Sequence, residues 1–187
     1  MPRWLAGVSA LALLCYPFFI YFGLEQFGLP AIGILLIVLF VLRISLGNQS
    51  RIEELKQLAR LTGVTGVGLI LLGILFDSHG WLTFYPVVVN LGMLVLFGYS
   101  LRQPRTIIER LARLQEPDLP ASGVRYTRTV TKVWCGYFII NGSIALYTCF
   151  QPLATWTLYN GLISYLLAGA LFFIEWIVRQ YVRRHAQ

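Results

Sequence analysis

Charged residues are scarce in this sequence, and their scarcity is the first limit on what the protein can be. Asp, Glu, Lys and Arg make up 12% of the 187 residues, whereas 57% of the residues are hydrophobic. A soluble domain carries about a quarter charged residues to cover its surface. The composition therefore argues against an ordinary water-soluble domain and indicates that most of the chain is surrounded by lipid.

Cysteine and histidine are also too few, and too poorly spaced, to build a chemical site. The three cysteines (Cys15, Cys135 and Cys149) show no C-x-x-C spacing and lie within apolar runs, so they indicate neither a disulfide framework nor a zinc site. The turn at 77–79 contains an Asp, a Ser and a His, but adjacent residues on a turn point in different directions, whereas a nucleophile and its base must meet. We therefore expect no catalytic residue, no metal ligand and no cofactor.

A continuous basic patch is missing as well, although the chain carries a net charge of +7. Its fifteen basic residues cluster instead at the ends of apolar runs, and seven of them lie between residues 101 and 133. This distribution argues against nucleic acid as a partner. It is typical of a membrane protein that attracts anionic lipid headgroups.

Long apolar runs are what the sequence has in abundance. Six of them are candidate transmembrane helices, at residues 5–23, 31–46, 61–76, 83–101, 130–150 and 156–178. The second run is slightly short for a bilayer core of about 30 Å. The first run competes with a secretory signal peptide, but the cleavage-like step Ala10-Leu11-Ala12 lies inside the apolar core, so we expect this segment to be retained. The sequence predicts an all-α polytopic membrane helix bundle that forms one domain over residues 1–187.

Single residues inside these runs carry further expectations. Pro17 should kink the first span, whereas Pro86 fits the first turn of the fourth. Asn141 lies near the middle of the fifth span and should hydrogen-bond to another helix, and Asn90 is a second amide inside a span. Trp134 is placed to anchor its span at the membrane interface.

Two segments between the runs are amphipathic, and each predicts a short helix on the membrane surface. The first covers residues 51–60. The second covers residues 104–116, where a proline stands at the start and another follows the end. Its apolar face holds Ile107, Ile108, Leu111 and Leu114, and its charged face holds Arg105, Glu109, Arg113 and Glu116. We expect the apolar face to sink to headgroup depth while the arginines meet phosphates, and residues 117–123 to form a linker.

The basic residues of this loop and of the following helix are the candidate site for an anionic lipid or a partner protein. They are Arg105, Arg110, Arg113, Arg128 and Lys132. If both termini are cytoplasmic, all fifteen basic residues lie on the cytoplasmic side, and the outer turns carry only Glu25 and Asp77. Glu175 and Arg179 are four apart near the inner end of the last span and can form an ion pair.

Spaced aromatic, glycine and proline positions over about residues 15–180 resemble the septation protein A family of small bacterial inner-membrane proteins. The similar stretches are 16–19, 73–81 with 84–86, 107–111, 134–138 and 156–159. Two positions depart from the family pattern, because Tyr85 replaces a basic residue before Pro86 and the fifth-helix asparagine, Asn141, lies one turn early. The family is tied to envelope synthesis and septation without an established reaction, so the resemblance implies a bacterial inner-membrane setting more than a mechanism.

Three functions stay open at this point. The leading hypothesis is a non-enzymatic inner-membrane protein that supports the cell envelope, septation or lipid homeostasis, with anionic headgroups and envelope or division proteins as partners. A small transporter or flippase-like carrier is the alternative, using polar groups such as Asn160 and Ser164, although no charged residue lies at mid-membrane where ion-coupled carriers usually keep one. The third is a membrane-bound lipid enzyme, or an accessory membrane protein of a lipid or polyketide pathway, that holds a phosphorylated substrate with the basic loop.

Overall fold

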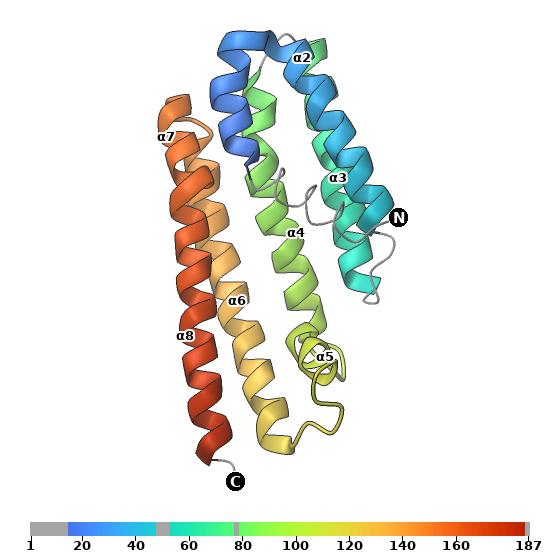
Figure 1. Cartoon of the computed structure of the whole chain (residues 1–187), viewed down its shortest axis with the longest axis vertical. Helices are drawn as coiled ribbons and strands as arrows, with labels where there is room; N and C mark the ends of the chain where they lie inside the picture. The colour runs from blue at the N-terminus through green and yellow to red at the C-terminus, as the bar shows by residue number, and fades with distance from the viewer. Residues whose placement is uncertain (1–14, 48–52, 77–78, 186–187) are drawn as a thin grey trace.

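The computed structural model describes residues 15–47, 53–76 and 79–185, and all regular elements in these ranges are helices (Figure 1). In chain order they are α2 Tyr16–Gly47, α3 Glu53–Leu75, the 3₁₀ turn η1 His79–Phe84, α4 Tyr85–Ser100, α5 Ile107–Arg113, α6 Ala121–Thr148, α7 Leu153–Leu158, the π-helical turn η2 Tyr159–Ile163 and α8 Ser164–His185. The long helices run along one axis, with α2 and α3 on one side, α4 between, and α6 and α8 on the other. The predicted all-α class is confirmed for the described residues.

Two helices in the described part of the chain are long and apolar enough to cross a membrane. They are Gly80–Ser100, with 21 residues, and Leu153–Val182, with 30 residues. Shorter apolar helical segments cover Ala31–Leu42 and Ala59–Leu75. By length and composition, the two longer helices are compatible with a membrane location.

A sharp reversal divides α2 into two limbs that run in opposite directions (Figure 1). It is centred on Gly28, whose φ of 74° lies in the left-handed region that glycine adopts without steric cost. Pro17 lies in the first turn of α2, where proline is tolerated, and the turn before it, where the predicted kink would lie, is outside the described residues. Part of the first predicted span, residues 5–14, lies outside the described residues.

The predicted surface helix at 51–60 is not a separate element. Residues 53–60 form the first turns of α3, which continues to Leu75 without a break. No glycine or proline stands between Glu53 and Thr62, so nothing ends the helix before the apolar run begins. Residues 51 and 52 lie outside the described residues.

The last two long helices extend further than the apolar runs that predicted them. α6 begins at Ala121, inside the segment predicted as a linker, because Pro120 marks its N-terminal boundary and no further proline follows before residue 152. The sixth run becomes α7, η2 and α8, which follow one another from Leu153 to His185. Both helices project beyond the ends of α3 and α4 (Figure 1).

Aromatic side chains fill the core at the end of the bundle that holds the α2 reversal. Tyr16 is buried and its hydroxyl donates to the Leu82 carbonyl at 2.7 Å. The Trp156 indole, 1% exposed, donates to the Thr83 carbonyl at 2.9 Å. These two donors satisfy buried carbonyls of η1 and thereby fix the connection between α3 and α4.

A second core lies where α4, α5 and α6 meet. Its buried members include Phe97, Ile107, Trp134 and Phe138. Trp134 is 5% exposed and lies 4.5 Å, between ring centroids, from Phe172 of α8. Trp134, predicted to anchor its span at the interface, thus packs against aromatic side chains of the protein, including Tyr137 and Phe138.

Candidate functional site

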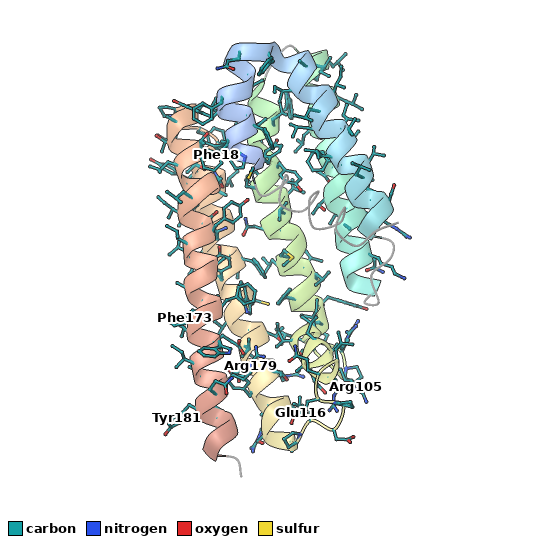
Figure 2. The ribbon with its side chains drawn as sticks, viewed as in Figure 1. Phe18, Arg105, Glu116, Phe173, Arg179 and Tyr181 are labelled. Carbon is teal, nitrogen blue, oxygen red and sulfur yellow. The ribbon has the colours of Figure 1, made fainter. Side chains whose placement is uncertain are left out.

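The fold brings the basic parts of several helices to one end of the bundle. Arg105, Glu116 and Arg179 lie near this end, whereas Phe18 lies toward the other (Figure 2). Residues 101–187 hold ten basic and four acidic residues, a net charge of +6. At the opposite end, the described residues 24–31, 79–84 and 148–158 include no Lys or Arg. We call the half formed by residues 101–134 and 172–185 the basic end.

Helix α5 is fixed in the basic end by its first residues. The Thr106 hydroxyl accepts the backbone N–H of Glu109 at 3.3 Å and so caps the helix. The backbone N–H of Ile107 donates to the Ser100 hydroxyl at 3.2 Å, and the Ile107 side chain is 1% exposed. The spacing Thr106-x-x-Glu109 is a capping-box pattern, a sequence signal that places the helix start at Ile107.

The predicted division of α5 into a lipid face and a charged face is wrong in two respects. Ile107 packs into the protein core, and Glu109, expected on the charged face, is 3% exposed. The helix is also shorter than 104–116, because it ends at Arg113. Ile108, Leu111 and Leu114 line a pocket of this same chain. α5 lies against α6, and side chains of α6 cover Ile107, which was expected to face lipid.

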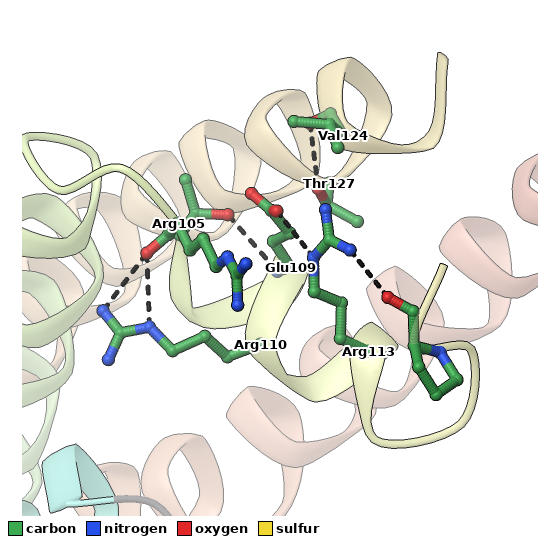
Figure 3. A network of polar contacts seen from close by, with 8 residues as sticks. Arg105, Glu109, Arg110, Arg113, Val124 and Thr127 are labelled. Carbon is green, nitrogen blue, oxygen red and sulfur yellow. Dashed lines mark hydrogen bonds and ion pairs between the residues drawn. The ribbon is translucent and has the colours of Figure 1, made fainter. Parts of the chain in front are cut away.

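Two of the five predicted site residues, both arginines, are bound within the loop (Figure 3). Arg110 donates from Nε and Nη2 to the Arg105 carbonyl, at 3.2 and 3.1 Å, and from Nη2 to Gln103. Arg113 pairs with Glu109 at 2.9 Å and donates to the Pro117 carbonyl at 2.7 Å. These guanidinium groups hold the loop closed, which leaves fewer of their donors for a ligand.

The other predicted residues present a basic surface. Arg105 and Lys132 are exposed, as are Arg102 and Arg125, and these four side chains make no hydrogen bond or ion pair with the described residues. Arg128 is exposed too and donates to the Leu101 carbonyl at 2.6 Å, which ties α6 to the end of α4. We call Arg102, Arg105, Arg125, Arg128 and Lys132 the basic stripe.

A pocket of about 380 Å³ lies between α5, α6 and α8, and we call it the interhelical pocket. Its walls are mainly apolar and include Ile108, Leu111, Val130, Trp134 and Phe172. The polar groups that line it include Tyr126, Glu175 and Arg179. Sequence reasoning missed this pocket, because no local pattern shows that α8 comes back beside α5.

The polar wall of this pocket is an ordered three-residue unit. Arg179 grips the Glu175 carboxylate with two bonds, Nε to Oε1 at 3.0 Å and Nη2 to Oε2 at 2.6 Å, which confirms the ion pair predicted from their spacing. The Tyr126 hydroxyl lies 3.0 Å from the Glu175 carbonyl and 3.2 Å from its Oε1. Burial, and then the Glu175 carboxylate, raise the pKa of Tyr126 to about 12, so the phenol stays neutral and remains a donor.

A separate polar cluster lies in the interior of the bundle and unites the two predicted asparagines. Asn141 of α6 donates to Asn90 Oδ1 of α4 at 3.0 Å, and Tyr159 of η2 donates to Asn141 Oδ1 at 2.9 Å. Asn90 in turn donates to the Pro86 carbonyl at 2.8 Å, in the first turn of α4. This cluster joins α4, α6 and η2. Among the described residues, no hydrogen bond links it to the basic stripe.

Neither a metal centre nor a known relative adds to this picture. Among the described residues, no group of three or more His, Cys, Asp or Glu side chains could hold a metal ion. Comparison with protein-family models, with curated proteins and with solved structures gave no match. The candidate site is a basic surface with an apolar pocket beside it.

Proposed function

We propose that this protein is a multi-pass membrane protein, with six spans and both termini in the cytoplasm, whose basic end binds the anionic headgroups of the inner membrane. It acts without catalysing a reaction, in support of the cell envelope, septation or lipid homeostasis. The setting is that of the septation protein A family, which the spaced motifs of the sequence resemble. Envelope or division proteins are its further partners.

One observation carries this proposal: the basic helix ends of a very apolar bundle gather at one end. Charge alone predicts a single basic side from the order of runs along the chain, and ten of the fifteen basic residues lie in the basic end, which supports the proposal. Anionic lipid attracts each nearby Lys or Arg with about 1 kcal/mol, and salt weakens this attraction. The basic stripe supplies such residues, four of which have no partner among the described residues.

Lipid retention by the purified full-length protein tests the proposal. We expect native mass spectrometry to show more bound phosphatidylglycerol than phosphatidylcholine, with a preference that declines as salt is raised. A variant carrying Arg102→Gln, Arg105→Gln, Arg125→Gln and Lys132→Gln should lose most of that preference, by about 1 kcal/mol for each removed charge.

A charge-preserving variant is the matched control for this experiment. Exchanging the same arginines for Lys and Lys132 for Arg keeps the field of the stripe, so the preference should persist. Equal retention of the two lipids by the unmodified protein would show that the basic residues do not select anionic headgroups, and the proposal would then be wrong.

A further inference from the structure

The interhelical pocket has an aromatic part inside the bundle and a polar unit nearer the tip of the basic end. On α6, Trp134 lies eight residues further into the bundle than Tyr126, and on α8, Phe172 lies seven residues further in than Arg179. Leu119, Val182 and Glu116 also line the pocket near the tip. An amphiphile with an apolar tail and a polar head has the same order of groups. The volume of about 380 Å³ falls in the range of roughly 300–1,000 Å³ typical of small-ligand sites. A partner helix, about 10 Å across with its side chains, needs a larger groove.

The length of the last helix places the aromatic part of the pocket at the depth of lipid tails and the polar unit at the depth of lipid headgroups. At 1.5 Å per residue, Phe172 lies about 28 Å along the axis from Leu153, and Arg179 about 39 Å. A bilayer has a hydrocarbon core of about 30 Å, and about 40–45 Å with its headgroups. With Leu153 in the outer headgroup layer, about 5 Å outside the core, Phe172 lies inside the hydrocarbon and Arg179 lies in the opposite headgroup layer.

Arg179 retains donors that point to an anionic ligand. A guanidinium group has five N–H donors, and the two bonds to Glu175 use two of them. The arginine side chain is 41% exposed, whereas that of Glu175 is 9% exposed. Because Arg179 and Tyr126 together occupy the carboxylate, the accessible edge of this unit is the donor edge of the guanidinium.

The pocket is a different surface from the part of the basic stripe that α6 carries. Tyr126 and Val130 line the pocket, and Arg128 and Lys132 follow each of them by two residues. Two residues of an α-helix are separated by about 200°, so the two sets lie on opposite faces of α6. A ligand in the pocket and headgroups around the stripe can therefore be distinguished by experiment.

From this arrangement we infer that the interhelical pocket binds one acyl chain of a phospholipid, whose phosphate accepts hydrogen bonds from Arg179. The tail lies against Trp134 and Phe172, and the headgroup lies beside the Glu175–Arg179 pair. This inference rests on the proposed function, because it needs the basic end to lie at a membrane surface. It adds a defined site for a single lipid to a general attraction for anionic membrane.

Photolabelling of the full-length protein in nanodiscs tests the inference. The probe is phosphatidylglycerol with a diazirine in one acyl chain, and a diacylglycerol with the same chain serves as the probe without a phosphate. We expect the phospholipid probe to label residues such as Leu111, Val130 and Phe172, and to do so at a concentration at least tenfold lower than the diacylglycerol. Equal labelling by both probes would overturn the role of Arg179.

Two substitutions examine the tail and the headgroup contacts separately. Leu111→Trp fills the pocket from a position that is 37% exposed, so we expect a stable protein with at least tenfold less pocket labelling. Leu146→Trp is the matched control, because Leu146 is 42% exposed on the same bundle and does not line the pocket. Arg179→Lys keeps a charge for Glu175 but lacks the planar fork, and should lower labelling by the phospholipid about tenfold without affecting the diacylglycerol.

The outcomes separate this inference from the proposed function. Labelling confined to the outer, lipid-facing surface, with an intact preference for phosphatidylglycerol, would overturn the pocket site and leave the proposed function standing. Loss of that preference together with outer-surface labelling would contradict both. Unchanged pocket labelling in Leu111→Trp would also overturn the assignment of the acyl chain to this pocket.

Discussion

A hydrogen bond between two buried amides sets how α4 and α6 pack, and it requires the two helices to approach closely at Gly142. Asn141 and Asn90 are 6% and 8% exposed, so each needs a partner inside an apolar bundle. A Cβ at Gly142 would lie 3.1 Å from the Asn90 Cβ, which shows that α6 comes near enough for the two amides to meet. Interhelical hydrogen bonds in lipid contribute about 0.6 kcal/mol on average. The Asn141–Asn90 pair therefore aligns α6 with α4 as much as it stabilises the fold.

Replacing Asn141 tests this contact at the scale of one residue. Asn141→Leu should insert normally and lower the free energy of unfolding by roughly 0.6–2 kcal/mol, because Asn90 Oδ1 and the Tyr159 hydroxyl lose their partner. Ser143→Leu is the control, since Ser143 is exposed and bonds only to its own helix at the Ile139 carbonyl. Unfolding in mixed detergent micelles measures both; a loss of stability in the control equal to that of Asn141→Leu would contradict an interhelical role.

Glycine controls the distance between the second limb of α2 and α3 at the scale of elements. A Cβ at Gly66 would lie 2.5 Å from ring atoms of Phe40, which is fully buried, and one at Gly63 would lie 2.4 Å from Ile44. Small residues at such a contact let two helices approach closely, the common solution in membrane bundles. The structure assigns this role to Gly63 and Gly66 and not to Gly68, which has open space around it.

The pair Gly66 and Gly68 gives a matched test of that packing. Gly66→Ala should lower the stability of the purified protein by about 1–3 kcal/mol, because the buried Phe40 ring has no room to move aside. Gly68→Ala should be neutral or stabilising by up to about 1 kcal/mol, because alanine favours the helix. Thermal unfolding followed by circular dichroism compares them, and equal effects of the two substitutions would contradict a contact specific to Gly66.

Sequence reasoning succeeded for elements whose signals are local and failed where a distant helix decides the outcome. Pro86 marks a helix start and the Glu175–Arg179 spacing an ion pair, and each needs only neighbours along the chain. The burial of Trp134 could not be predicted in that way, because Phe172 of the distant helix α8 packs against its ring. For the same reason the pocket between α5, α6 and α8 is visible only in three dimensions.

At the scale of the whole molecule, apolar surface and basic charge are arranged as a membrane demands. Large side chains of α8 such as Phe173 and Tyr181, each more than half exposed, point away from the bundle (Figure 2). Such a surface is costly in water and ordinary in lipid. In the proposed orientation the basic end, with ten basic and four acidic residues, faces the cytoplasm, because cytoplasmic loops are enriched in Lys and Arg.

Reporter fusions test this orientation in living cells. A fluorescent protein that matures only in the cytoplasm, fused after Gln187, should give signal, because ten basic residues from Arg102 to Arg184 resist transfer across the membrane. An alkaline phosphatase that is active only outside the cytoplasm, fused after Phe84 at the end of η1, should be active, because the described residues of this end carry no Lys or Arg. A dark fusion at Gln187 together with active phosphatase at the same position would reverse the orientation. The basic end would then face away from the cytoplasmic leaflet, and the proposed lipid site at Arg179 would lose its membrane surface.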